Sequence, residues 1–310
     1  MRTECPPHAA SREHNMVAFV AKIFICRPNH FLPRNFGFLL FFSFLSMPCI
    51  TMAQADQSLR PPPAYADVAD LVSASPLIAK ARINRIESVN GSVTNPAQSS
   101  KKYALVTARI ESLIRGTDGL PQKVRFLVVL PSAKNSTDRD TKRWRKGMQI
   151  LIFARAGDRL DALQLVSRNA IQPWNTELDA ITRALTTEIL SARPAPAIVS
   201  VGDAFHVAGT VAGESETQIF LKTATGEPVS LSVVHRSGEA PRWGVSLGEI
   251  VDDTAAPPKQ DTLLWYRLAC GLPEILPAAS TRGLALLDAE AARRDYRFVM
   301  ESLGRCGRTL

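Results

Sequence analysis

The feature that most constrains this chain is a hydrophobic period of two that recurs through much of residues 77–247. Apolar residues alternate with polar ones in the runs 79–84 and 106–111, and an apolar period of two returns over 124–130. Such alternation is typical of β-strands that bury one face. The inward positions are Ala79, Ala81, Ile83, Val106, Ala108, Ile110, Val124, Phe126, Val128 and Leu130.

Two further strands complete this first set. Residues 150–154 form an unbroken apolar run, and a turn over 157–161 leads into the short run 163–166. Five strands separated by polar loops, after a short helix that must stop before Pro76, predict a small closed or half-closed antiparallel barrel. We place this barrel at residues 64–172.

A second strand-rich region follows a linking helix. Asn175 or Thr176 caps a helix with apolar residues at three-to-four spacing, and the linking segment spans 173–196. We assign 197–310 to a β-meander with two C-terminal helices. The strands are expected at 198–199, 205–211, 218–222, 229–234 and 243–247. The first helix is expected at 263–270, with Gly271 at the C′ position. The second is expected at 288–303, where Asp288 caps its start and Gly304 ends it. The predicted fold class is mainly β, of the α+β type.

The first 55 residues differ in character from the rest. Eight of the 13 Phe lie there, and an apolar stretch over 36–47 is shorter than the ~20 residues that cross a bilayer. The small-x-small sequence Ala53-Gln54-Ala55 follows it. We predict a signal peptide over 1–55, cleaved after Ala55, a Pro-rich leader over 56–63, and a periplasmic or secreted protein without a transmembrane segment after processing. The alternative is an N-terminal anchor that is not cleaved. Translation starts at either Met1 or Met16, and the sequence leaves both open.

Cysteine usage supports this compartment. After cleavage only Cys270 and Cys306 remain, and two cysteines in an oxidising compartment most often form one disulfide. Closing a loop of about 37 residues would stabilise the fold by roughly 4 kcal/mol in the chain-entropy model. Two unrelated thiols are the alternative.

The order of elements in 66–170 resembles the OB-like barrels of secreted netrin-type and tissue-inhibitor modules. The shared pattern is a short helix and a strand, a strand ending in Leu113-Ile114-Arg115-Gly116, a further strand, the apolar strand 150–154 and a final hairpin. Those modules commonly begin with a disulfide-bonded Cys-x-Cys, whose leading Cys chelates the target's metal in the inhibitors. Because residues 56–80 contain no Cys, metalloprotease inhibition does not carry over.

The chain as a whole also resembles a family of uncharacterised exported bacterial proteins. The resemblance implies export and no particular activity. The segments that carry it are 64–71 (Ala-Tyr-Ala-Asp-Val-Ala-Asp-Leu), 216–221 (Glu-Thr-Gln-Ile-Phe-Leu), 241–245 (Pro-Arg-Trp-Gly-Val) and 261–270 (Asp-Thr-Leu-Leu-Trp-Tyr-Arg-Leu-Ala-Cys).

Few residues carry recognisable chemistry. After residue 55 the only histidines are His206 and His235, so a His-rich metal site is excluded, and we expect no metal, no cofactor and no catalytic residue. No nucleophile elbow, metalloprotease helix or phosphate-binding loop occurs. The alternative is a periplasmic hydrolase whose site lies between the two regions around His206, His235 and nearby carboxylates. The hydrolase would be favoured if both imidazoles and a Ser or carboxylate side chain lay in one cleft.

The densest charge provides a candidate contact surface. Four cations flank one aromatic residue in Lys142, Arg143, Trp144, Arg145 and Lys146, and the whole chain carries a formal net charge of +8. An exported protein meets anionic envelope components before nucleic acid, so we expect an anionic ligand or envelope protein as partner and no nucleic acid. A solvated loop with Trp144 packed on the barrel is the alternative. Together these features predict a non-enzymatic binding or envelope-associated module.

Overall fold

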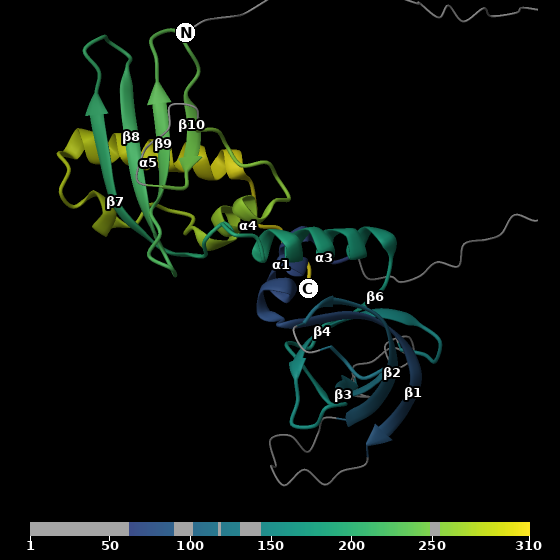
Figure 1. Cartoon of the computed structure of the whole chain (residues 1–310). Coiled ribbons are helices and arrows are strands. Elements are labelled where there is room, and N and C mark those ends of the chain that lie inside the picture. The colour runs from purple at the N-terminus through teal and green to yellow at the C-terminus, as the bar shows by residue number, and fades with distance from the viewer. Residues whose placement is uncertain (1–61, 90–101, 117–118, 131–143, 249–254) are drawn as a thin grey trace, which may run out of the picture. The chain divides into compact units, whose positions relative to one another are not determined.

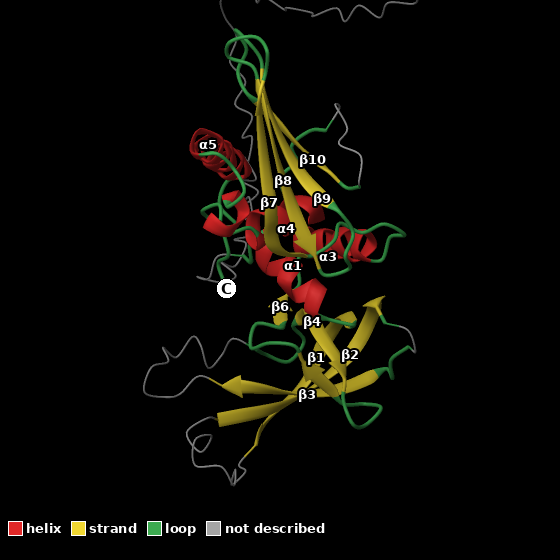
Figure 2. Cartoon of the chain, turned by 90° about the vertical axis from the view of Figure 1, so that its left-hand side faces the viewer, coloured by secondary structure: helices red, strands yellow, loops and turns green. Residues whose placement is uncertain are grey.

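The computed structural model describes residues 62–89, 102–116, 119–130, 144–248 and 255–310. Over these ranges the chain forms ten strands in two antiparallel sheets, together with four α-helices and one 3₁₀ turn (Figures 1 and 2). The prediction of a mainly β, α+β fold is confirmed. The described residues belong to one compact unit, and none of their helices is long and apolar enough to span a bilayer.

The first sheet follows the predicted order of strands. It contains β1 (Leu77–Val89), β2 (Lys102–Arg115), β3 (Lys123–Leu130), β4 (Gln149–Ala156) and β5 (Leu163–Leu165), in the spatial order β3-β2-β1-β4-β5. A sixth strand that we did not predict, β6 (Ile171–Pro173), pairs with β4. Three register irregularities between β1 and β2 bend these long strands, as β-bulges do.

This sheet curls without closing into a barrel. Its two ends meet through a single parallel bridge between Arg125 of β3 and Ala162, which directly precedes β5, and the Arg125 amide donates to the Asp161 carbonyl at 2.7 Å. The half-closed form that we predicted therefore describes the sheet, and a closed barrel is not observed over the described residues.

The unbroken apolar run of β4 is buried on both faces. Ile150, Ile152 and Ala154 point into the interior of the curled sheet, while Leu151 and Phe153 join a second core on its outer side. Helices α1 (Tyr65–Ala74) and α3 (Thr176–Ile189) contribute to that second core. The prediction of α3 is confirmed, and its cap is Asn175, whose side chain accepts a hydrogen bond from the Leu178 amide at 2.7 Å.

The second sheet is a four-stranded meander in the order β10-β9-β8-β7. It contains β7 (Ile198–Ala208), β8 (Ser215–Thr223), β9 (Val229–His235) and β10 (Arg242–Ser246). We predicted two separate strands at 198–199 and 205–211, but β7 is continuous, with a register shift between Val201 and Ala204. Gly202 lies in this irregular stretch, where a Cβ atom would be 3.1 Å from the Phe220 carbonyl oxygen.

Two helices and a 3₁₀ turn follow: α4 (Leu263–Gly271), η2 (Ala278–Thr281) and α5 (Leu286–Leu303). The predicted role of Gly271 was wrong, because it is the last residue of α4 and lies against Ile198 rather than adopting a left-handed conformation. The predicted role of Asp288 as a cap was also wrong, since α5 begins at Leu286 and Asp288 lies in its first turn. Gly304, at φ 72°, ends α5 as predicted.

The predicted disulfide is present in the structure. Cys270 in the last turn of α4 is bonded to Cys306, which lies three residues after α5, and their Cα atoms are 4.9 Å apart. The second core includes residues of α1, α3, α4, α5, β4 and the four-stranded sheet. The assignment of 64–172 and 197–310 to separate domains stays a prediction.

Candidate ligand-binding site

One face of the four-stranded sheet brings both histidines beneath α5. Side chains two residues apart on a strand share a face, so His206 and Ala208 of β7 lie on the same side of the sheet. In the neighbouring strands His206 pairs with Thr217, and Ser215 pairs with His235. Helix α5 lies across the sheet on this side (Figures 1 and 2).

Helix α5 supplies one carboxylate for each imidazole. Asp288 and Asp295 are seven residues apart, which places them on one face of the helix about 10 Å from each other. Asp288 Oδ1 lies 2.9 Å from His206 Nδ1, and Asp295 Oδ1 lies 2.8 Å from His235 Nε2. Two His–Asp pairs therefore connect the helix with the sheet.

The Asp295 carboxylate is the more buried of the two. Its side chain is 7% exposed, against 38% for Asp288. The hydroxyl of the buried Thr217 donates to Oδ2 while His235 occupies Oδ1, so both carboxylate oxygens are satisfied. A buried carboxylate with two such partners is fixed in position and holds the imidazole in one orientation.

The two pairs use different ring nitrogens. A carboxylate only accepts hydrogen bonds, so the nitrogen that faces it must carry the proton. In the neutral ring, His206 is then protonated on Nδ1 and has its lone pair on Nε2, whereas His235 is protonated on Nε2 and has its lone pair on Nδ1. The helix thus fixes two imidazoles as opposite tautomers.

Both pairs line one open hollow of about 410 Å³ between α5 and the sheet. Its rim carries charges of both signs, because Glu214 and Arg294 contribute to the lining and form no ion pair with another described residue. The lining consists of His206, Ala208, Gly213, Glu214, Ser215, His235, Leu287, Asp288, Ala291, Arg294 and Asp295.

The position of the hollow bears on the sequence interpretation. Both imidazoles, three carboxylates and Ser215 line one hollow, which is the arrangement expected of a catalytic site. All its lining residues come from 206–295, so residues 64–172 contribute nothing to it. In the part of the chain that the structure describes, no cluster of three or more His, Cys, Asp or Glu side chains could hold a metal ion.

The basic segment is only partly described. Lys142 and Arg143 lie outside the described residues. Trp144 is half-buried and packs against the core of the curled sheet, while Arg145 and Lys146 are exposed before Gly147, which has φ 85°. An anionic contact through this segment stays a prediction.

Sequence reasoning found the histidines but not the residues that hold them. Asp295 lies on the buried face of α5 beside Ala292, Tyr296 and Val299. A carboxylate within such an apolar stripe requires a partner, and this was the signal available in the sequence. This signal could not identify His235 as the partner of Asp295, because the two residues are 60 positions apart in the sequence.

Comparisons with known proteins add no further assignment. No protein-family model matches this chain. A search of the curated proteins likewise returns no match.

Proposed function

We propose that this chain is an extracytoplasmic binding protein that holds a small zwitterionic solute, such as an amino acid or short peptide, in the hollow between α5 and the four-stranded sheet. The observation that carries the proposal is the pair of imidazoles, each oriented by an aspartate of α5, lining one open hollow. Small-ligand sites combine such a concave surface with a few fixed polar groups.

The charges of the lining indicate the ligand class. Arg294 offers a guanidinium that suits a carboxylate, and Glu214 offers a carboxylate that suits an ammonium group. The imidazole lone pairs add hydrogen-bond acceptors whose positions are fixed by Asp288 and Asp295. A solute with both signs of charge would satisfy all these groups, whereas an apolar solute would leave them unpaired.

The proposed location outside the cytoplasm is supported by two features. The apolar stretch over 36–47 and the Ala53-Gln54-Ala55 sequence have the pattern of a cleaved export signal. The Cys270–Cys306 disulfide is of a kind that persists in oxidising compartments.

The experiment uses the histidines as reporters. The chain from residue 56 onward contains two histidines, so a long-range ¹H–¹⁵N spectrum of protein labelled in histidine shows two imidazoles. We would titrate this protein with free amino acids and with dipeptides, one compound at a time. The proposal predicts that at least one compound shifts both imidazoles in a saturable way, with one dissociation constant.

Charge variants test the proposed contacts. Arg294→Gln should weaken binding of a carboxylate-bearing compound by about tenfold or more, as expected for the loss of a charge-assisted hydrogen bond. Arg297→Gln is the matched control, because Arg297 is an exposed arginine of the same helix outside the hollow. If no compound shifts either imidazole, or if both variants behave alike, the proposed ligand class is wrong.

A hydrolase at the same hollow is the second candidate. The observation that favours it is the Asp295–His235 pair, supported by Thr217, with Ser215 as the strand neighbour of His235. Such an arrangement orients a general base beside a hydroxyl. Against it, no hydrogen bond joins Ser215 Oγ to either imidazole among the described residues.

A fluorophosphonate reagent separates the two candidates, because it labels serines that are activated by a neighbouring base. Covalent labelling of Ser215 that is lost in His235→Gln would favour the hydrolase. Saturable solute binding without labelling of Ser215 would favour the binding protein.

A further inference from the structure

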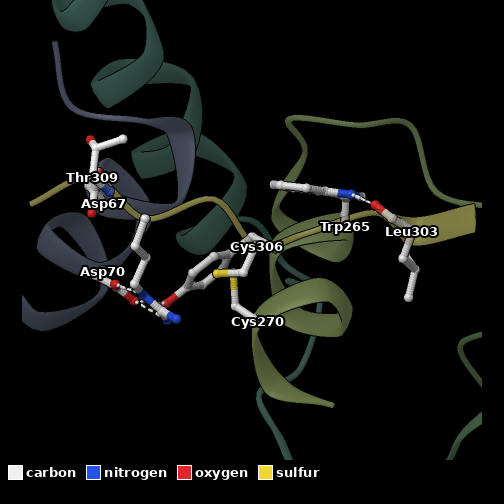
Figure 3. Close-up of a disulfide and its surroundings, with 9 residues drawn as sticks. Asp67, Asp70, Trp265, Cys270, Leu303, Cys306 and Thr309 are labelled. Carbon is white, nitrogen blue, oxygen red and sulfur yellow. Dashed lines mark hydrogen bonds and ion pairs between the residues drawn. A yellow bond between two sulfur atoms is a disulfide. The ribbon is translucent and has the colours of Figure 1, made fainter. Parts of the chain in front are cut away.

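The last seven residues, which follow α5, run back to the first helix of the described chain (Figure 3). Cys306 holds the start of this segment, residues 304–310, to Cys270 of α4. Beyond it, Arg308, Thr309 and Leu310 contact two aspartates of α1. We call residues 304–310 the C-terminal tail.

The two aspartates receive the tail with complementary geometry. Asp67 and Asp70 are three residues apart and so lie on one face of α1. Asp67 Oδ2 accepts hydrogen bonds from the Thr309 amide at 2.9 Å and the Thr309 hydroxyl at 2.7 Å, and Oδ1 accepts from the Leu310 amide at 3.3 Å. Asp70 binds the Arg308 guanidinium through both oxygens, at 2.6 and 3.1 Å.

Asp67 also fixes the start of α1. Its Oδ2 accepts from the Ala64 amide at 2.9 Å, and the residue is 4% exposed. The tail therefore shares a buried carboxylate with the helix end, and its removal would expose that carboxylate to solvent. The Asp70 site is more open, since the side chains of Asp70 and Arg308 are 40% and 46% exposed.

The tail has two further anchors, because Leu310 packs against the second core and the Thr309 hydroxyl accepts a hydrogen bond from the Ala64 amide at 3.2 Å. It forms no helix or strand, and it contains glycines in the left-handed region on both sides of Cys306, Gly304 at φ 72° and Gly307 at φ 67°. Exposed ion pairs hold a segment weakly. The disulfide raises the local concentration of Arg308 and Thr309 at α1, in the way that a short linker favours an intramolecular contact.

Part of the contact between α1 and α4 is made without the tail, although Asp70 Oδ1 accepts from both Tyr266 and Arg308. The Tyr65 and Trp265 rings meet edge to face at 6.1 Å, and the Tyr266 hydroxyl donates to Asp70 at 2.5 Å. The Trp265 indole also donates to the Leu303 carbonyl, upstream of the disulfide. Loss of the tail would thus leave the helices packed while freeing one face of α1.

We propose that the Cys270–Cys306 disulfide acts as a redox-controlled latch, which keeps the C-terminal tail on Asp67 and Asp70 when oxidised and releases it when reduced. Both cysteines are half-buried at the edge of the second core, and the proposal requires that a thiolate reaches the bond there. A dithiol reductant breaks the S–S bond by exchange, gives two electrons and two protons to form two thiols, and itself becomes a disulfide. The released state exposes an acidic face of α1.

Hydrogen–deuterium exchange tests this latch in the full mature chain. The amides of Thr309 and Leu310 are hydrogen-bonded to Asp67 in the oxidised protein, so they should exchange slowly. We would compare oxidised protein with protein reduced by dithiothreitol and alkylated, and with the Cys270→Ser/Cys306→Ser double variant. We expect exchange in the tail to accelerate by about tenfold or more in both.

Two controls distinguish release of the tail from unfolding of the whole protein. Asp67→Asn in oxidised protein should also accelerate exchange in the tail, because it weakens the acceptor without touching the disulfide. Amides of β8 and β9 should stay protected in the double variant, which shows that the fold persists. If the tail exchanges equally in oxidised and reduced protein while β8 and β9 remain protected, the latch is disproved. Loss of protection in β8 and β9 as well would also disprove it, since the disulfide would then hold the fold rather than the tail.

Discussion

Both sheets are antiparallel and bury apolar side chains, but one end of the covered face of the four-stranded sheet is polar. Over the described residues, the buried side chains in the interior of the curled sheet are apolar and include Ile83, Phe126 and Ile152. The layer between the four-stranded sheet and α5 is apolar over much of its area, where Ile219, Leu231 and Tyr296 are buried. Its end beside the hollow instead contains Thr217, Asp295 and two imidazoles. An apolar interior gains stability from burial alone, whereas a polar layer must satisfy each hydrogen-bonding group.

This difference indicates a division of roles. Fixed polar groups next to an open hollow are what a ligand requires, and a closely packed apolar interior offers no such groups. We therefore propose that the polar end of this layer binds the ligand, whereas apolar burial in both regions stabilises the fold. Variants in the curled sheet should change the unfolding free energy and leave the tautomers of the two imidazoles unchanged. Variants in the polar end should change those tautomers.

The largest effect is expected in the apolar interior. Phe126 is 2% exposed, and Phe126→Ala should lower the unfolding free energy by about 3–5 kcal/mol, because the cavity adds to the loss of burial. Leu127→Ala is the matched control, since Leu127 is the next residue of β3 and is 54% exposed. Urea unfolding measures both. Equal losses in the two variants would contradict the assignment of the core.

A smaller effect is expected at the polar end of the layer between α5 and the four-stranded sheet. Asp295→Ala should cost about 2 kcal/mol, because it leaves the buried Thr217 hydroxyl and one ring nitrogen of His235 without their acceptor. Asp288→Ala serves as the comparison on the same helix and should cost less, since Asp288 is 38% exposed. If Asp288→Ala lowered the unfolding free energy more than Asp295→Ala, Asp295 would not be the more buried carboxylate.

The smallest effect concerns the pH dependence of the tail contact. Burial acts to raise the pKa of the Asp70 carboxyl, but hydrogen bonds from Arg308 and Tyr266 outweigh it and lower that pKa below its usual range. The ionised form is thus favoured by folding, so its contribution is present above the unfolded pKa of about 3.9 and is lost as pH falls through the folded value.

The Asp70→Asn variant isolates this contribution. The stability advantage of the natural protein over the variant should shrink as pH falls from 5 to 2, and we expect it to stay below about 1 kcal/mol because the ion pair is substantially exposed. Urea unfolding at several pH values measures it. An advantage that grows on acidification would mean that Asp70 is not ionised in the fold.

The sequence predicted most of the strands because their signal is local. The period of two in β1, β2 and β3 depends only on neighbouring residues, and the apolar run 150–154 revealed a strand buried on both faces. The three residues of β6 are too few to show a period. The break at Gly202 and Asp203 concealed the continuity of β7, because a bulge interrupts the alternation without ending the strand.

The site was predictable only in part. The scarcity of histidine singled out His206 and His235, but their partners Asp288 and Asp295 are 82 and 60 residues away. The same holds for the tail, because Thr309 binds Asp67 across 242 residues. Such pairings are decided by packing of distant segments, and no local pattern encodes them.

The tautomeric state of the two imidazoles tests the central claim most directly. In a long-range ¹H–¹⁵N spectrum recorded at a pH where the rings are neutral, we predict that His206 is protonated on Nδ1 and His235 on Nε2, and that Asp295→Ala changes the spectrum of His235 alone. Two imidazoles that both exchange freely between tautomers, as in a solvated side chain, would show that α5 does not hold them and would remove the basis for a ligand site in this hollow.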